Sequence, residues 1–118
     1  MTEAGRVPYQ AGDILLADLD PVAGHEQGGR RPVLVLSGPS YNELRNEQLI
    51  VAAITRRQRN LPFHIAVGTD SGLRVASWVQ AESVRAISVQ RIVRLLGHVR
   101  PQALADVRSQ VINFLRDW

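Results

Sequence analysis

The sequence contains no cysteine and no long apolar run. Without cysteine the chain can form neither disulfides nor thiolate metal sites, a composition typical of proteins in a reducing cytosol. No apolar run approaches the roughly 18 residues that a membrane-spanning helix needs, and residues 1–13 lack the apolar segment of a secretory signal. We therefore expect a cytoplasmic protein. Its 118 residues match the usual size of one compact core, so we expect a single domain over residues 1–118.

Lysine is also absent, because all 14 basic residues are arginine, and the net charge is +3. Arginine makes planar, bidentate contacts to phosphate and stacks on bases, whereas lysine acts as a hydrated point charge. A small basic protein that relies on arginine is therefore a candidate for nucleic-acid binding. A GC-rich coding sequence would produce the same bias, so composition leaves both explanations open.

Short apolar runs with intervening turn signals predict a mainly β protein that ends in an α-helix. The expected strands cover residues 13–19, 32–37, 49–55, 63–67, 73–80, 83–87 and 94–99. We expect a turn, with at most one helical turn, over 38–48, a helical turn opened by Ser88 over 88–93, and Pro32 at the first position of its strand, where no ladder donor is needed.

From Pro101 onwards the apolar residues recur at helical spacing, which predicts an amphipathic helix. The recurring positions are Leu104, Val107, Val111, Phe114, Leu115 and Trp118. Short strands at tight spacing favour a small curled antiparallel sheet or an SH3-like open barrel. Such a sheet has unpaired edges, and a homodimer is one way to cover them.

The stretch "GHEQGGRRPVLVLS", residues 24–37, joins a polar, glycine-containing loop directly to a buried strand. His25, Glu26, Arg30 and Arg31 lie within seven residues of one another. Arginine can stabilise charge on a phosphoryl oxygen, and histidine or glutamate can move protons, so the loop is a candidate phosphate site. The alternative is a solvated loop with a weak surface ion pair.

A second arginine cluster, "TRRQRN" at residues 55–60, follows the end of another predicted strand. Arg56, Arg57 and Arg59 could follow a phosphate backbone, and the hydroxyl of Thr55 could reach a phosphate oxygen. The alternatives are solubilising charge and an ordinary strand threonine.

His64, Glu82 and Ser83 are further candidates. His64 could act as a base or as a stacking surface for RNA, or simply pack within the sheet. Glu82 and Ser83 could form a second polar edge of the site, or alternate with apolar residues on a half-exposed strand. His25, His64 and His98 lack the paired spacing of zinc ligands, so we expect neither a metal nor another cofactor.

The order of these blocks resembles the MazF/PemK (Kid) family of toxin endoribonucleases, the mRNA interferases of type II toxin–antitoxin systems. The specific block is GD followed by G-x-E-Q-x-x-x-R-P-V-L-V, and "VAAIT", "LPFHIAV" and "ESVRAIS" follow in the family's order. The resemblance runs from about residue 9 into the C-terminal helix. It implies a MazF/CcdB-like curled sheet, a homodimer, metal-independent cleavage of single-stranded RNA, and inhibition by a cognate antitoxin with an acidic tail.

The resemblance assigns the central catalytic role to Arg31, with Thr55 as its partner and Glu26 in the adjacent loop. Two positions depart from the family pattern: His25 stands where serine is common, and Ser83 where glutamine is frequent. The remaining substrate-binding candidates are Gln27, Gly28, Arg30, Arg56, Arg57, Arg59, His64, Glu82 and Ser83.

Metal-independent RNA cleavage uses the ribose 2′-hydroxyl as the nucleophile and leaves a 2′,3′-cyclic phosphate and a 5′-hydroxyl. Because arginine stays protonated, it is a poor general base. Chemistry alone therefore favours His25 or Glu26 as the base, with Arg31 binding the phosphate. Two other functions stay open at this point, a CcdB-like toxin that binds gyrase and a non-catalytic RNA-binding barrel.

Overall fold

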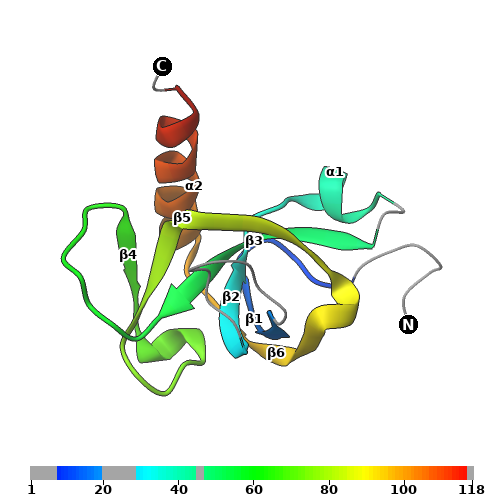
Figure 1. Ribbon diagram of the computed structural model, residues 1–118, viewed down its shortest axis with the longest axis horizontal. Coiled ribbons are helices and arrows are strands. Elements are labelled where there is room, and N and C mark those ends of the chain that lie inside the picture. Colours follow the sequence, from blue (N-terminus) through cyan, green and yellow to red (C-terminus); the bar gives the residue numbers. More distant parts are fainter. Residues whose placement is uncertain (1–7, 20–28, 45–46, 117–118) are drawn as a thin grey trace.

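The computed structural model describes residues 8–19, 29–44 and 47–116. Within them, six strands form one antiparallel sheet in the order β4-β5-β3-β2-β1-β6 (Figure 1). The strands are β1 (Asp13–Asp18), β2 (Arg30–Val35), β3 (Gln48–Thr55), β4 (His64–Val67), β5 (Ser77–Ser88) and β6 (Ile92–His98). The helical elements are α1 (Pro39–Asn42), η1 (Thr69–Ser71), η2 (Val89–Arg91) and α2 (Pro101–Arg116). The predicted fold class, mainly β with a C-terminal helix, is confirmed.

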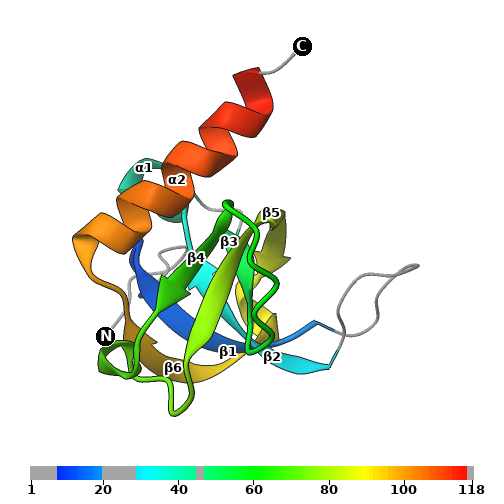
Figure 2. The ribbon, with the colours of Figure 1, turned by 90° about the vertical axis from the view of Figure 1, so that its left-hand side faces the viewer.

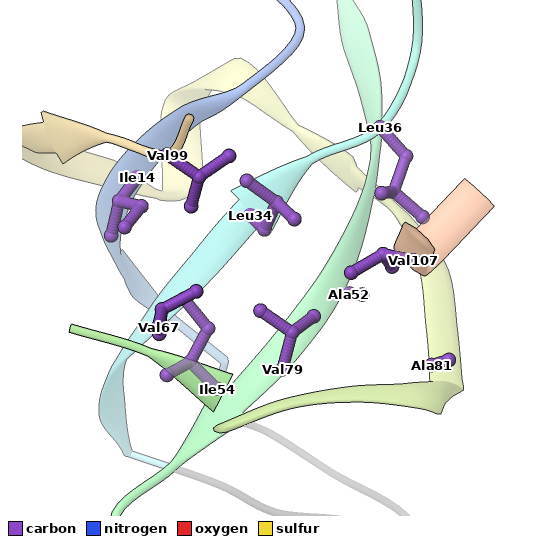
Figure 3. Close-up of a cluster of buried hydrophobic side chains, with 10 residues drawn as sticks. All are labelled: Ile14, Leu34, Leu36, Ala52, Ile54, Val67, Val79, Ala81, Val99 and Val107. Atoms are coloured by element: carbon purple, nitrogen blue, oxygen red, sulfur yellow. The ribbon is translucent and has the colours of Figure 1, made fainter. Parts of the chain in front are cut away.

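The curled sheet buries apolar side chains on both faces. The first apolar cluster includes Ile14, Leu34, Ile54 and Val79, and α2 adds Val107 to it (Figure 3). The second apolar cluster is formed by Leu15, Ala17, Leu19, Val33, Val35, Leu49, Val51 and Ile87. Since β1, β2 and β3 contribute alternate residues to both clusters, their sequences are continuous apolar runs rather than alternating ones.

Several boundaries differ from those predicted. β2 begins at Arg30, so Pro32 is its third residue and not its first. Proline has no backbone N–H to donate to a second ladder, and at Pro32 no second ladder is formed. Pro32 pairs with Leu16 of β1, whereas the pairing of β2 with β3 begins only at Val33. The two strands predicted over 73–80 and 83–87 are one strand, β5, in which a register shift against β3 marks a bend rather than a break.

The turn around Ser88 is shorter than predicted but is capped as expected. Only Val89–Arg91 are helical, and the Ser88 hydroxyl accepts a hydrogen bond from the backbone N–H of Gln90 at 3.2 Å. β6 follows at once and therefore begins at Ile92, two residues earlier than predicted. Early entry into β6 allows Ala17 of β1 to pair with Ile92.

The helix α2 covers the first apolar cluster with residues up to Val111, and its C-terminal end projects beyond the strands (Figure 2). Val107 is fully buried, and the Arg108 guanidinium donates two hydrogen bonds to the Leu36 carbonyl, at 2.7 and 3.1 Å. Phe114 makes an edge-to-face contact with Phe63. Leu115, predicted on the packed face, is instead 80% exposed. Neither helix in the described part of the chain combines the length and apolar character needed to cross a bilayer.

Two glycines hold η1 and the residues after it against β6. A Cβ on Gly97 would lie 2.0 Å from the carbonyl oxygen of Ser71, and one on Gly72 would lie 2.3 Å from the carbonyl oxygen of Leu96. Gly72 also has a φ of +97°, which favours glycine. The backbones of β6 and of the segment before β5 therefore touch only because both positions lack a side chain.

Candidate active site

The sheet brings the ends of β2 and β3 together at the predicted catalytic residues. Val33 of β2 pairs with Ala53 of β3 in an antiparallel register. Each step back along β2 is matched by a step forward along β3, so continuing this register by two residues places Arg31 beside Thr55. Both residues also lie on the sheet face of Val33, because side chains alternate along a strand. The register thus brings the strand ends that carry Arg31 and Thr55 next to each other.

A groove of about 670 Å³ opens at these strand ends. Arg31 and Pro32 of β2, Ile54 and Arg56 of β3, and Arg94 of β6 line part of it. The facing wall is the segment that precedes β5, held there by the glycine contact described above. The groove thus depends on strands that are far apart in the sequence but adjacent at one end of the sheet.

Arginine dominates the charge of this groove. Its lining includes Arg30, Arg31, Arg56, Arg74 and Arg94, and no acidic residue is among its described lining residues. Guanidinium groups that converge on one hollow raise the local positive potential and concentrate anions there. Because arginine also matches phosphate geometry, the groove suits a phosphodiester chain.

The side-chain hydroxyl of Thr55 already accepts one hydrogen bond. Its Oγ1 accepts a hydrogen bond from the backbone N–H of Arg57 at 3.1 Å, in a half-buried position. A hydroxyl carries one hydrogen to donate in addition to its acceptor lone pairs. The contact with Arg57 therefore fixes the oxygen and leaves its hydrogen available to a phosphoryl oxygen placed beside Arg31.

His64 and Glu82 form a separate polar pair across β4 and β5. Nε2 of His64 lies 2.8 Å from Oε2 of Glu82, and the side chains are 2% and 38% exposed. The edge of the Phe63 ring packs against the imidazole, and Nδ1 of His64 has no hydrogen-bond partner. In this arrangement His64 orients Glu82, and only the carboxylate is accessible to a ligand.

The other predicted site residues fall into three groups. Arg30 and Arg56 line the groove, whereas Arg57 and Arg59 are exposed on the segment after β3 and Ser83 is half-buried on β5. His25, Glu26, Gln27 and Gly28 lie outside the described residues. The two described residues that flank this stretch are in contact, because the Leu19 N–H donates to the Gly29 carbonyl oxygen at 2.9 Å.

Sequence reasoning missed three residues that the fold brings to the site. Arg74 and Arg94 line the groove, and Trp78 of β5 pairs with Thr55. For Trp78 the sequence offered only its position within the strand expected over 73–80. No signal connected Arg74 and Arg94 with Arg31. No group of three or more His, Asp or Glu side chains arranged to hold a metal occurs among the described residues.

Comparisons with known proteins agree with this fold. The family model of PemK-like, MazF-like toxins of type II toxin–antitoxin systems matches residues 10–115. Endoribonuclease EndoA of Bacillus subtilis is 36% identical over 99 residues, covering 81% of this chain and 84% of EndoA.

Two crystal structures from Deinococcus radiodurans are also similar. MazF superposes with a TM-score of 0.82 at 31% identity, covering 91% of this chain and 96% of that one. A MazE–MazF structure gives a TM-score of 0.74 at 31% identity, covering 91% and 95% of the two chains. The resemblance inferred from sequence blocks is thereby confirmed. The chain belongs to the family of PemK-like, MazF-like toxins of type II toxin–antitoxin systems.

Proposed function

We propose that this chain is a cytoplasmic, metal-independent endoribonuclease toxin, a single domain over residues 1–118, which cuts single-stranded RNA beside Arg31 and Thr55. Family membership and a relative named as an endoribonuclease support the activity. The observation that carries the proposal is that Arg31 lines an arginine-rich groove, while Thr55 ends the neighbouring strand just outside the groove's lining.

The chemistry follows from what each group can do. The ribose 2′-oxygen attacks the adjacent phosphorus, its bond to phosphorus forms, and the bond to the 5′-oxygen breaks. Arg31 stabilises the negative charge that develops on the phosphoryl oxygens, and Thr55 donates its hydroxyl hydrogen to one of them. Glu26 or His25 takes the proton from the 2′-hydroxyl, and the leaving 5′-oxygen receives a proton from solvent. The products are a 2′,3′-cyclic phosphate and a 5′-hydroxyl.

Substrate binding divides between backbone and bases. Arg30, Arg56, Arg74 and Arg94 bind phosphates along the groove, with Arg57 and Arg59 extending this positive surface. Gln27 and Gly28, next to Glu26 in the sequence, are further candidates for substrate binding. The Glu82 carboxylate, oriented by His64, accepts hydrogen bonds from a base edge, and Ser83 lies next to it on β5.

The decisive experiment maps the ends of RNA fragments made by the purified protein in the presence of a chelator. We expect cuts at defined sequences with 2′,3′-cyclic phosphate and 5′-hydroxyl ends. Cleavage that requires a divalent cation, or that leaves 5′-phosphates, would contradict the proposed chemistry. Salt-dependent RNA binding without scission would favour a non-catalytic RNA-binding barrel, and gyrase inhibition without RNA cleavage would favour a CcdB-like toxin.

A cognate antitoxin is the second expected partner. The crystal structure of MazE–MazF from Deinococcus radiodurans shows that a similar toxin is found in such a complex. The arginine-lined groove suits an acidic segment for the same electrostatic reason that it suits RNA. We therefore expect the antitoxin to compete with RNA for this protein.

The third proposed partner is a second copy of the chain. Ile112 and Leu115 lie three residues apart on one face of α2 and are 47% and 80% exposed, near the helix end that projects beyond the strands (Figure 2). We propose that this apolar face is buried in a homodimer. Leu115→Glu should shift the sedimentation of the protein from dimer to monomer, whereas Leu44→Glu, at another exposed leucine, should not. A dimer that resists Leu115→Glu would place the interface elsewhere.

A further inference from the structure

Trp78 stands beside the proposed catalytic threonine. In the sheet it pairs with Thr55 of β3 on one side and with Ala66 of β4 on the other. Residues that face each other in an antiparallel pair have Cβ atoms about 4.5–5.5 Å apart and point to the same face. The indole ring is therefore an immediate neighbour of the Thr55 hydroxyl.

The indole is not packed into either apolar cluster. Trp78 is half-buried, whereas Val79 beside it is fully buried in the first apolar cluster. Its two cross-strand neighbours, Thr55 and Ala66, are small, and Ala66 is itself exposed. These small neighbours leave part of the ring surface exposed, so Trp78 differs from the fully buried core residues beside it.

The contacts of Trp78 support this reading. The ring contacts of the described residues pair Phe63 with His64 and with Phe114, and neither includes the indole. The described part of the chain also provides no hydrogen-bond partner for the indole N–H. Nδ1 of His64 is the only buried side-chain polar atom without a partner among those residues, so the indole N–H must reach solvent. The indole N–H of Trp78 is thus accessible, and the residue as a whole is partly exposed.

We propose that Trp78 is the platform on which a base adjacent to the scissile phosphate stacks. Proteins that recognise single-stranded RNA stack unpaired bases on aromatic side chains, and a phosphate held by Arg31 and Thr55 carries its nearest bases past the indole. This inference rests on the proposed nuclease function, because it takes Thr55 as the position of the cut.

Under this proposal Trp78 and Glu82 have different roles in RNA recognition. Stacking accepts any base, because every base has a π-face. Glu82 lies four residues further along β5, and its orientation is set by His64. Trp78 therefore supplies affinity, whereas Glu82 selects the base by its edge.

Binding can be measured without cleavage by using a 2′-O-methyl-modified single-stranded RNA of about 20 mixed-sequence nucleotides, which lacks the attacking hydroxyl. In a Trp118→Phe background Trp78 is the only tryptophan. We expect its fluorescence to be quenched saturably as this RNA binds. In the same background, Trp78→Phe should bind within about threefold of the parent, whereas Trp78→Leu should bind about tenfold more weakly, since one base stack is lost.

Tyr41→Leu is the matched control, because Tyr41 is a half-buried aromatic residue on α1, away from the groove. Its affinity should not change. Thermal unfolding of each variant separates loss of stacking from loss of fold. If Trp78→Leu is unstable, the fluorescence titration of the parent and the affinity of Trp78→Phe still test the proposal.

The stacking proposal and the nuclease proposal can be refuted separately. An active protein whose Trp78 fluorescence is unchanged by RNA, and whose Trp78→Leu variant binds normally, overturns the stacking platform and leaves the nuclease intact. A protein that cuts no RNA, but loses affinity with Trp78→Leu and keeps it with Trp78→Phe, retains the platform and refutes the nuclease. In an active protein Trp78→Leu should raise KM about tenfold with little change in kcat.

Discussion

Two hollows of this molecule are similar in size but differ in charge. The arginine-lined groove has a volume of about 670 Å³, and a second cavity of about 470 Å³ lies between η1 and the start of α2. In the second cavity Arg100 is paired with Asp70 at 2.7 Å, and Asp106 adds a further carboxylate. In the groove, the described lining holds five arginines and no carboxylate. Apart from its larger volume, the groove differs from the second cavity chiefly in its unbalanced positive charge.

The largest expected effect is the loss of RNA cleavage when Arg31 is removed from the groove. Removal of Arg100 from the second cavity is the comparison. Arg31→Ala should lower kcat for RNA cleavage by about 10²- to 10³-fold, the usual effect of losing a group that stabilises transition-state charge. Because Arg31 is exposed, the melting temperature should change little. Arg100→Ala should leave cleavage within twofold. Equal losses for both variants, or a folded Arg31→Ala protein with normal turnover, would remove the distinction between the two hollows.

The next effect concerns the glycine contact that both hollows share, since Ser71 lines the cavity and Gly72 lines the groove. Gly97→Ala would place a Cβ against the backbone of Ser71, and overpacking of this kind lowers the free energy of unfolding by about 1–3 kcal/mol. Denaturant unfolding measures this change, and kcat/KM should fall with it because the groove wall moves. Gly38→Ala is the control, because its Cβ would meet only Arg108 at an ordinary 3.8 Å.

A smaller effect is expected at Thr55. Thr55→Val preserves shape but removes the hydroxyl, so kcat should fall about tenfold, which corresponds to about 1.4 kcal/mol of transition-state stabilisation. Thr55→Ser should recover most of the rate in single-turnover cleavage. If Thr55→Ser and Thr55→Val cleave RNA at the same rate, the hydroxyl has no part in the reaction and Thr55 has only a structural role in β3.

The smallest effect is expected in the second cavity. Asp70→Asn breaks the ion pair with Arg100, whose side chains are 81% and 50% exposed. Exposed pairs contribute about 0.2–1 kcal/mol, so the melting temperature should fall by a few degrees at most and cleavage should not change. A marked loss of cleavage would show that this cavity belongs to the active site.

The candidate site was predictable where it depends on neighbouring strands. Arg31 and Thr55 end two apolar runs that follow each other in the sequence, and consecutive antiparallel strands usually pair. Arg74 and Arg94 could not be found in this way. Their place in the groove depends on the pairing of β1 with β6, in which Leu16 meets Arg94, and on the backbone contact of Gly97 with Ser71. No local pattern predicts a register across nearly 80 residues.

Proximity in the sequence was a poor guide for the cluster after β3. Arg56, Arg57 and Arg59 were treated as one basic patch, but only Arg56 lines the groove. Once the strand ends, the regular alternation of side chains no longer holds neighbouring arginines on one surface. Trp78 was missed for a related reason, because its role depends on which residues flank it across β3 and β4 rather than along β5.

The pairing of β1 with β6 has a consequence for synthesis of the protein. It joins Asp13 to His98, so the ribosome must translate most of the message before β1 gains its second partner. A nascent chain that stops short of residue 92 has no β6, and with it lacks Arg94 and Leu96 from the groove wall. A premature stop codon anywhere upstream of that point therefore releases a fragment without this wall, and the groove is assembled only when translation is almost complete.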